Sequence, residues 1–222
     1  SGGNYNTVVG EVAGEALTTG DKNAYIGAYA GNGNTTDSYN AYIGYYAGSA
    51  TSAGNGGWRN VAVGSGAFNN YNRANVDYSV AIGYNALTGS SSGDYNTAVG
   101  ANSNVYYSNS TRNTSIGYSA KTGYQQNVSV GYHAGYSMYG QSDYCNFVGA
   151  WAGYDMDGGD YCNFFGGAAG YAGGSGSYNN GFGNYALSSL TSGGYNSGVG
   201  HYSLHKVTSG ANNVGVGNYS GQ

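Results

Sequence analysis

The chain contains 222 residues with a formal net charge of −4, and only 7% of them are charged, which disfavours nucleic-acid binding because that function needs a basic stripe. Glycine occurs 44 times, far above its usual share of roughly 7%, tyrosine occurs 27 times, and proline is absent. No segment resembles a transmembrane span or a signal peptide.

One phrase, Asn-x-x-[Val/Ile/Phe]-Gly-x-x-[Ala/Ser], recurs thirteen times along the chain with few departures. Its glycine is called the pivot below, and the pivots are Gly10, Gly27, Gly44, Gly64, Gly83, Gly100, Gly117, Gly131, Gly149, Gly166, Gly183, Gly200 and Gly217. Most pivots are 17 residues apart, and the extremes are 14 and 20. A period that runs through the whole sequence predicts a repeat array and a single domain over residues 1–222.

The positions of the repeat have distinct characters. The residue before the pivot is always apolar and mostly β-branched, as at Val99, which predicts a strand residue that points into a core. The residue three after the pivot is always Ala or Ser, which indicates tight packing. Asn lies four before the pivot in ten copies, and Ser79, Cys145 and Cys162 replace it in the others. Stacked Asn side chains can bond the backbone and one another.

This repeat is too short for a propeller blade and too rich in Gly and β-branched residues for a helical hairpin. It predicts an all-β fold, a parallel β-solenoid (β-roll) of about 13 coils in which each coil has two short strands and two turns. Coils would stack at roughly 4.8 Å, giving a rod about 60 Å long.

Variations in coil length follow the chain order. The first coils keep to 17 residues, and longer excursions then occur at residues 49–59 and 69–78, which we expect to project as neighbouring surface loops. The step of 14 residues between Gly117 and Gly131 is the shortest coil. From Gly149 to Gly217 the spacing is constant, so this part should be the straightest.

Residues 60–67 and 79–86 resemble the head repeat of trimeric autotransporter adhesins. Residues 39–48, within the commoner 17-residue coil, resemble tandem repeats of phage tail-fibre proteins and related bacterial surface proteins. The resemblance covers nearly the whole chain. It implies a left-handed roll and a homotrimer. The polar, weakly charged composition, rich in Tyr, Asn, Ser and Gly, favours an extracellular or virion location.

Aromatic residues fall into columns that could bind a partner. One column lies five before the pivot and comprises Tyr5, Tyr39, Tyr78, Tyr95, Tyr144, Tyr161, Tyr178 and Tyr195. The candidate binding residues are Tyr29, Tyr46, Trp151, Tyr185, Tyr202 and Tyr219, two after the pivot, with Trp58 and Tyr71 from the long excursions. Exposed rings would stack on sugars or on a protein. Alternatively, the rings brace neighbouring coils or are buried between chains, which is the favoured interpretation for the column five before the pivot.

Cys145 and Cys162 occupy the same position of adjacent coils, each within Tyr-Cys-Asn-Phe. Stacked positions lie within the Cα range of a disulfide, although parallel side chains would strain the bond. An oxidising compartment would permit that bond. The alternatives are buried free thiols that replace Asn, which we favour slightly, and a metal site, which two thiols without nearby His support poorly.

Asp155, Asp157 and Asp160 cluster in one loop and form a weak calcium candidate, because Ca²⁺ needs six or more oxygens. A solvated turn is the favoured interpretation. The histidines make no interpretable Ser/His/Asp arrangement, and the glycine-rich run at 170–176 lacks the Lys-Ser/Thr of a phosphate loop. We therefore expect no enzymatic activity and no cofactor.

These observations favour a structural or receptor-binding segment of an extracellular fibre, a phage tail fibre or adhesin head, that attaches to a cell-surface glycan or protein and associates with itself. The alternative is a self-assembling filament, because head-to-tail joining would give a spacing of 15 residues between Gly217 and Gly10, close to the length of a normal coil. An ice-binding solenoid would need a Thr column, and a glycan-cleaving enzyme would need carboxylate columns. Neither is visible.

Overall fold

The computed structural model describes residues 3–50, 57–69, 76–88, 93–105, 109–138 and 140–221. Contacts divide the chain into two compact units, Ser1–Arg112 and Asn113–Gln222, and each is described by itself. The regular secondary structure of the described residues is entirely β. These residues contain no apolar helix long enough to cross a bilayer. Tyr71 and most of the two long excursions lie outside the described residues.

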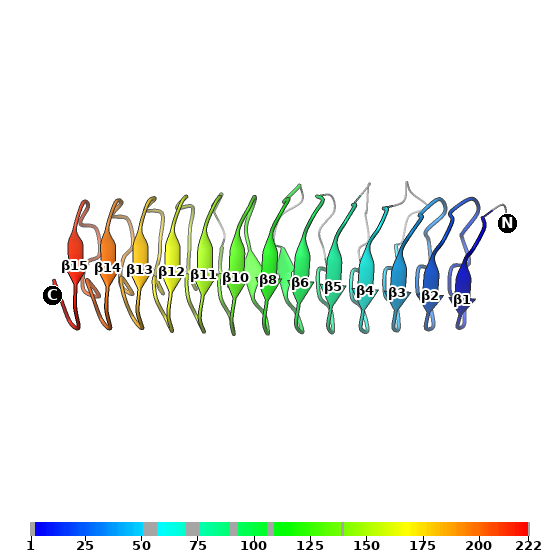
Figure 1. Cartoon of the computed structure of the whole chain (residues 1–222), viewed down its shortest axis with the longest axis horizontal. Coiled ribbons are helices and arrows are strands. Elements are labelled where there is room, and N and C mark those ends of the chain that lie inside the picture. The colour runs from blue at the N-terminus through cyan, green and yellow to red at the C-terminus, as the bar shows by residue number, and fades with distance from the viewer. Residues whose placement is uncertain are drawn as a thin grey trace. The chain divides into compact units, whose positions relative to one another are not determined.

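The first unit stacks one strand per coil, and Figure 1 shows these strands side by side. Its strands are β1 (Thr7–Val9), β2 (Ala24–Ile26), β3 (Ala41–Ile43), β4 (Val61–Val63), β5 (Val80–Ile82), β6 (Thr97–Val99) and the short β7 (Asn104–Val105). From β1 to β6 each strand pairs in parallel with the next, and equivalent repeat positions face one another, as in Ala81 and Ala98.

The second unit repeats this arrangement. Its strands are β8 (Thr114–Ile116), β9 (Lys121–Thr122), β10 (Val128–Val130), β11 (Asn146–Val148), β12 (Asn163–Phe165), β13 (Asn180–Phe182), β14 (Ser197–Val199) and β15 (Val214–Val216). β8 pairs with β10, and each later strand pairs with the next in parallel. The pairings enclose five full turns in the first unit and six in the second, which confirms the predicted parallel β-solenoid.

The prediction of two strands per coil was wrong for most coils. Among the described residues, only β7 and β9 add a second strand, and each has two residues. The rest of each coil is turn. Residues five before and two after the pivot have φ between +49° and +65°. The chain therefore bends sharply at both ends of each three-residue strand that precedes a pivot.

The apolar residue before the pivot does not point into the core, as was predicted. The middle residue of the strand does: Ala98 is fully buried, whereas Val99 is half-buried. Because side chains alternate across a strand, a strand of three residues sends only its middle one inward. The outer apolar column, as we call the residues before the pivots, is exposed by 37–71% at Val9, Ile26, Ile43, Ile82, Ile116, Phe165, Phe182, Val199 and Val216.

The core is filled by pairs of residues six apart whose sizes compensate. Tyr25 lies against Gly31, where an added Cβ would come within 2.6 Å of the ring, and Phe164 is paired with Gly170 in the same way. One coil after Phe164 the sizes are reversed, since Gly181 takes the strand position and the buried Leu187 follows six residues later. In these coils the exchange of sizes keeps the interior filled while the strand residue varies from Gly to Tyr, as close packing requires.

The pivot glycines are required by close stacking of the coils. Their φ lies between +115° and +140°, a region that side-chain-bearing residues rarely adopt. A Cβ on Gly166 would also lie 2.6 Å from the carbonyl oxygen of Gly183 in the next coil. The Ala or Ser three after the pivot is buried in most coils, as the sequence predicted.

The predicted Asn ladder is present and joins successive coils. Asn127 donates from Nδ2 to the carbonyl of Ser142 at 2.8 Å, and its Oδ1 accepts from the backbone N–H of Cys145 at 2.8 Å. Asn60 makes the equivalent bonds to Val76 and Ser79. One buried side chain thus satisfies a donor and an acceptor of the next coil at a corner that no strand pairing reaches.

The alternation along β6 predicts opposite outcomes for two adjacent substitutions. Ala98→Asp buries an unpaired charge and should lower the free energy of unfolding by roughly 3 kcal/mol or more. Val99→Asp places the charge on the outer face and should cost under about 1 kcal/mol. Chemical denaturation followed by circular dichroism at low protein concentration measures both. Equal destabilisation would contradict the assignment of the two faces.

The compensating pairs predict a coupling between Phe164 and Gly170. Phe164→Gly should destabilise by about 3–5 kcal/mol through a cavity, and Gly170→Leu by about 1–3 kcal/mol through overpacking. The double variant reproduces the arrangement of Gly181 and Leu187, so its cost should be below the sum by about 1–3 kcal/mol. Denaturant melts of the four proteins give the coupling energy. Strict additivity would show that the pair does not share space.

Candidate functional site

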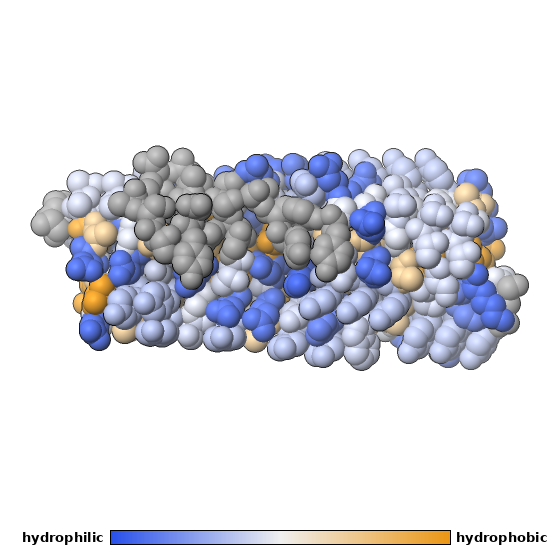
Figure 2. All heavy atoms as spheres, turned by 180° about the vertical axis from the view of Figure 1, so that it is seen from behind, coloured by the Kyte–Doolittle hydropathy of each residue, from blue (hydrophilic) through white to orange (hydrophobic). Residues whose placement is uncertain are grey.

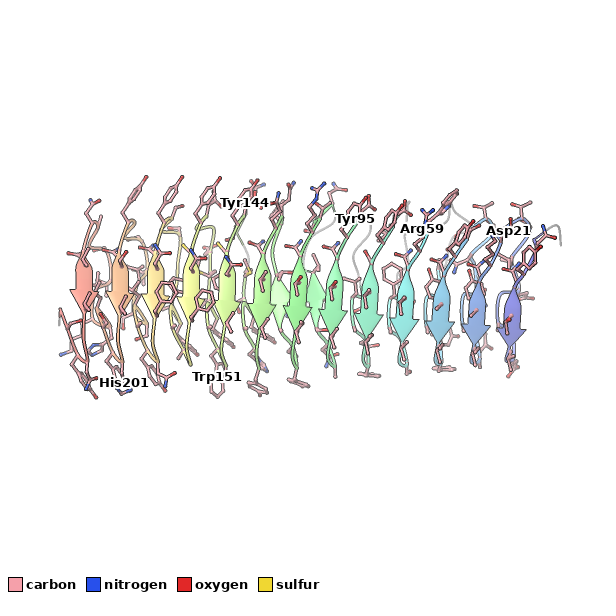
Figure 3. All side chains as sticks on the ribbon, viewed as in Figure 1. Asp21, Arg59, Tyr95, Tyr144, Trp151 and His201 are labelled. Atoms are coloured by element: carbon pink, nitrogen blue, oxygen red, sulfur yellow. The ribbon has the colours of Figure 1, made fainter. Side chains whose placement is uncertain are left out.

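Two aromatic ladders flank the strands. The leading ladder is formed by the residues five before the pivots and the trailing ladder by those two after them. Figure 3 shows Tyr144 of the leading ladder and Trp151 of the trailing ladder pointing away from opposite ends of β11. The side chains at both positions start from left-handed corners, where a bulky residue is strained by roughly 1–2 kcal/mol.

Leading-ladder tyrosines are both stacked and exposed. Ring centroids are 5.0 Å apart between Tyr161 and Tyr178 and 4.8 Å apart between Tyr178 and Tyr195, with interplanar angles of 7° and 9°. Tyr178 is nevertheless 43% exposed. Desolvation and the neighbouring Tyr144 and Tyr178 raise the pKa of Tyr161 above its usual value. The rings therefore brace adjacent coils and leave one edge of the ladder exposed to solvent.

In the first unit, cations share the leading ladder with tyrosines, a feature that the scattered sequence positions did not reveal. Lys22 donates to the Tyr39 hydroxyl at 3.0 Å, and this bond raises the lysine's pKa. Arg59 donates to the Tyr78 hydroxyl at 2.7 Å, with its guanidinium 5.2 Å from that ring's centroid. Such cation–π contacts hold the cations against the ladder.

A column of carboxylates six before the pivot was missed by the sequence interpretation. Asp77 and Asp94 follow one another in this column, and the Oδ1 of Asp94 accepts the backbone N–H of Asp77 at 2.9 Å. Asp143 and Asp160 repeat the bond at 3.0 Å. The fixed offset from the pivot was the available signal. These carboxylates complete the backbone hydrogen bonding at the corner beside the leading ladder.

The structure separates the calcium candidates. Asp160 belongs to the carboxylate column, whereas Asp155 and Asp157 are exposed on a turn whose intervening Met156 is buried. Within the described residues, no group of three or more His, Cys, Asp or Glu side chains is placed to hold a metal ion.

Trailing-ladder residues stack in two runs. Tyr29 and Tyr46 have centroids 4.6 Å apart in the first unit. In the second unit, Tyr185, Tyr202 and Tyr219 stack at 4.8 and 5.0 Å. The structure therefore brings together the predicted residues in these runs. Trp58 lies elsewhere, beside Arg59 and one residue before the leading-ladder position.

A third aromatic run, five after the pivot, was not predicted. Tyr136, Tyr154 and Tyr171 stack at 5.3 and 5.0 Å. His133 packs on Tyr136 with centroids 4.5 Å apart, and burial together with the charge of Lys121 lowers its pKa. The second unit therefore carries a dense aromatic surface between the trailing ladder and this third run.

The two cysteines are free, buried thiols that continue the Asn ladder. Cys145 Sγ donates to the carbonyl of Gly159 at 3.1 Å, and Cys162 Sγ to that of Gly176 at 3.2 Å. The backbone N–H of Cys162 donates to Cys145 Sγ at 3.4 Å. The hydrogen bond with Cys162 and burial raise the pKa of the Cys145 thiol, so it stays neutral. The thiols thus take the role of the Asn that they replace.

No model of a known protein family, no curated protein and no solved structure matches the chain.

The strained corners predict an unusual order of stability at Tyr178, whose φ is +62°. Tyr178→Ala loses two ring stacks and keeps the strain. Tyr178→Gly loses the same stacks but relieves strain of roughly 1–2 kcal/mol. The Gly variant should therefore be the more stable of the two in a denaturant melt, the reverse of their usual order in regular structure. A more stable Ala variant would contradict the left-handed corner.

Proposed function

We propose that the chain is a structural and receptor-binding segment of an extracellular or virion fibre, which associates with copies of itself and attaches to a cell-surface glycan or protein. The outer apolar column is the single observation that carries this proposal. In this role the chain performs no catalysis and needs no cofactor.

The outer face of the sheet is as apolar as a sheet face that packs against another protein surface. On β3 to β5 both outward residues of each strand are apolar or Ala, for example Val80 and Ile82 on β5. Ile43 and Ile82 are 41% and 40% exposed. Parallel sheets are normally covered on both faces, and contiguous exposed apolar rows mark contact surfaces. A second copy offers an equivalent row and so supports the self-association proposed here.

The remaining surface suits attachment. Exposed tyrosines supply apolar ring faces and hydroxyls at a low cost in side-chain entropy. Figure 2 shows the side opposite to that in Figure 1, where the described residues are mostly hydrophilic or near-neutral in hydropathy. Such a surface is compatible with recognition of a polar, hydroxyl-rich partner by rows of rings.

A self-assembling filament is the second candidate, in which another copy would add a parallel strand beside β1. Val8 occupies the inward position of its strand yet is 41% exposed, whereas Tyr25, the equivalent residue of β2, is fully buried. An uncovered edge of this kind accepts a further parallel strand, from more repeats or from another copy.

The test is the solution mass of the chain, measured by light scattering across a concentration series. We expect a fixed multiple of the chain mass, because a closed oligomer buries the outer column. Phe165→Ser combined with Phe182→Ser should reduce the mass to one chain without unfolding it.

The matched control is Tyr161→Ser combined with Tyr178→Ser, which removes two exposed rings from the leading ladder and should leave the mass unchanged. A mass that rises without limit would favour the filament. A monomer at all concentrations would overturn self-association in both forms.

A further inference from the structure

The trailing ladder has a gap in the second unit. Trp151 and Tyr185 occupy the ladder position in the first and third of three successive coils, and the coil between them carries Ala168 instead. A pocket of about 360 Å³ opens there, lined by Trp151, Ala168, Tyr171, Tyr185 and Ser188. In the runs with an unbroken column of tyrosines, the neighbouring ring fills the equivalent space.

The backbone holds the gap in register. Ala168 N–H donates to the carbonyl of Ala150 at 2.8 Å, and Tyr185 N–H to that of Gly167 at 2.9 Å. These bonds repeat the one between Trp151 and Tyr132 at 2.8 Å. The two flanking ladder positions are therefore two coils apart, or roughly 9.6 Å at the usual strand spacing.

The rings around the gap are fixed in place by rings outside it. Tyr185 stacks on Tyr202 with centroids 4.8 Å apart, and Tyr171 stacks on Tyr154 at 5.0 Å. Trp151 packs edge-to-face with Tyr132 at 5.4 Å. Because these neighbours already restrict the rings before a ligand arrives, the rings lose little further conformational freedom on binding.

The lining of the gap sets the chemistry of the ligand. Where the column is unbroken, Tyr202 fills the same two-coil space between Tyr185 and Tyr219, with ring centroids 4.8 and 5.0 Å away. The gap therefore has room for one six-membered ring, and a pyranose ring presents C–H groups to the aromatic residues on both sides. Three lining residues, Tyr171, Tyr185 and Ser188, supply hydroxyls for its polar rim, and none of the five lining residues is charged.

We propose that the pocket over Ala168 is a binding site for one neutral pyranose unit of a glycan, held between Trp151 and Tyr185. This assignment deepens the proposed attachment function and rests on it. It places a defined sugar site on the trailing ladder, in addition to any contacts made by the exposed rows of rings.

The experiment uses the fluorescence of Trp151 in the full chain. The sequence contains two tryptophans, so Trp58→Phe leaves Trp151 as the sole reporter. Titration with methyl β-D-glucopyranoside and methyl β-D-galactopyranoside should give a saturable change for at least one sugar, with a Kd on the order of 1 mM, as one ring supports. N-acetyltyrosinamide serves as the flat-ring comparator and should bind at least tenfold more weakly, because its single phenolic hydroxyl cannot use the several hydroxyls of the lining.

Ala168→Tyr in the same background is the decisive variant. The corner at Ala168 has φ of +52°, close to the +57° of Tyr185, so the added ring should fill the gap without unfolding the coil. Sugar binding should fall at least tenfold. Asn102→Tyr adds a ring at the ladder position of another coil and should leave binding unchanged, with circular dichroism confirming the fold of both variants.

The outcomes separate this site from the wider function. The site is overturned if neither sugar changes Trp151 fluorescence, if Ala168→Tyr binds sugar as well as its background, or if the flat comparator binds more tightly. If cell-surface or glycan-array binding of the full chain is retained in Ala168→Tyr, the proposed function stands without this site. If the wild-type chain binds neither the sugars nor an array, attachment to glycans fails as well.

Discussion

Within each unit, the described coils complete much of their backbone hydrogen bonding on the neighbouring coils. Strand residues pair in parallel, buried Asn side chains bridge one corner, and Asp carboxylates accept N–H groups beside them. The pivot glycines allow the coils to approach closely enough for these bonds. Each residue is thereby stacked on its equivalent one coil away, so a side chain's offset from the pivot fixes its neighbours. This stacking of equivalent residues from coil to coil produces the columns, the ladders and the gap at Ala168.

The same constraint explains why tyrosine occupies strained positions. The corners at both ends of each strand need left-handed backbone, where Gly or Asn would be less strained. Tyrosine is used at many of these corners instead, and stacking across coils offsets part of the strain, since an aromatic pair contributes about 0.5–1.5 kcal/mol beyond its buried area.

The fold could be predicted from the sequence because the period is nearly constant and each column has a strict character. The direction of the strand side chains could not, since a strand of three residues has one inward position, and an apolar column fits either face. Val99 and Phe165 were misplaced for this reason. The inward position varies from Gly181 to Tyr25, and its regularity emerges only when it is paired with the residue six later. The proposed self-association rests on these apolar residues on the outer face.

The candidate site was partly predictable. The trailing-ladder residues Tyr185, Tyr202 and Tyr219 were identified from their offset and do stack. The third run through Tyr154 was overlooked because it spans only three coils, and the gap at Ala168 has no signature without the rings around it. Trp58 was predicted as a candidate from a long excursion, and its place beside the leading-ladder residue Arg59 was not foreseen.

Hydroxyl-radical footprinting of the phenylalanines across a concentration series tests the central claim most directly, because neighbours in sequence face opposite ways. In dilute protein, Phe165 and Phe182 should be modified, while Phe147 and Phe164 should be protected by the core. As protein concentration rises, Phe165 and Phe182 should become protected, and the leading-ladder tyrosines should stay reactive. Reactive Phe147 and Phe164 with protected Phe165 and Phe182 in dilute protein would contradict the assignment of the two faces on which the account is built.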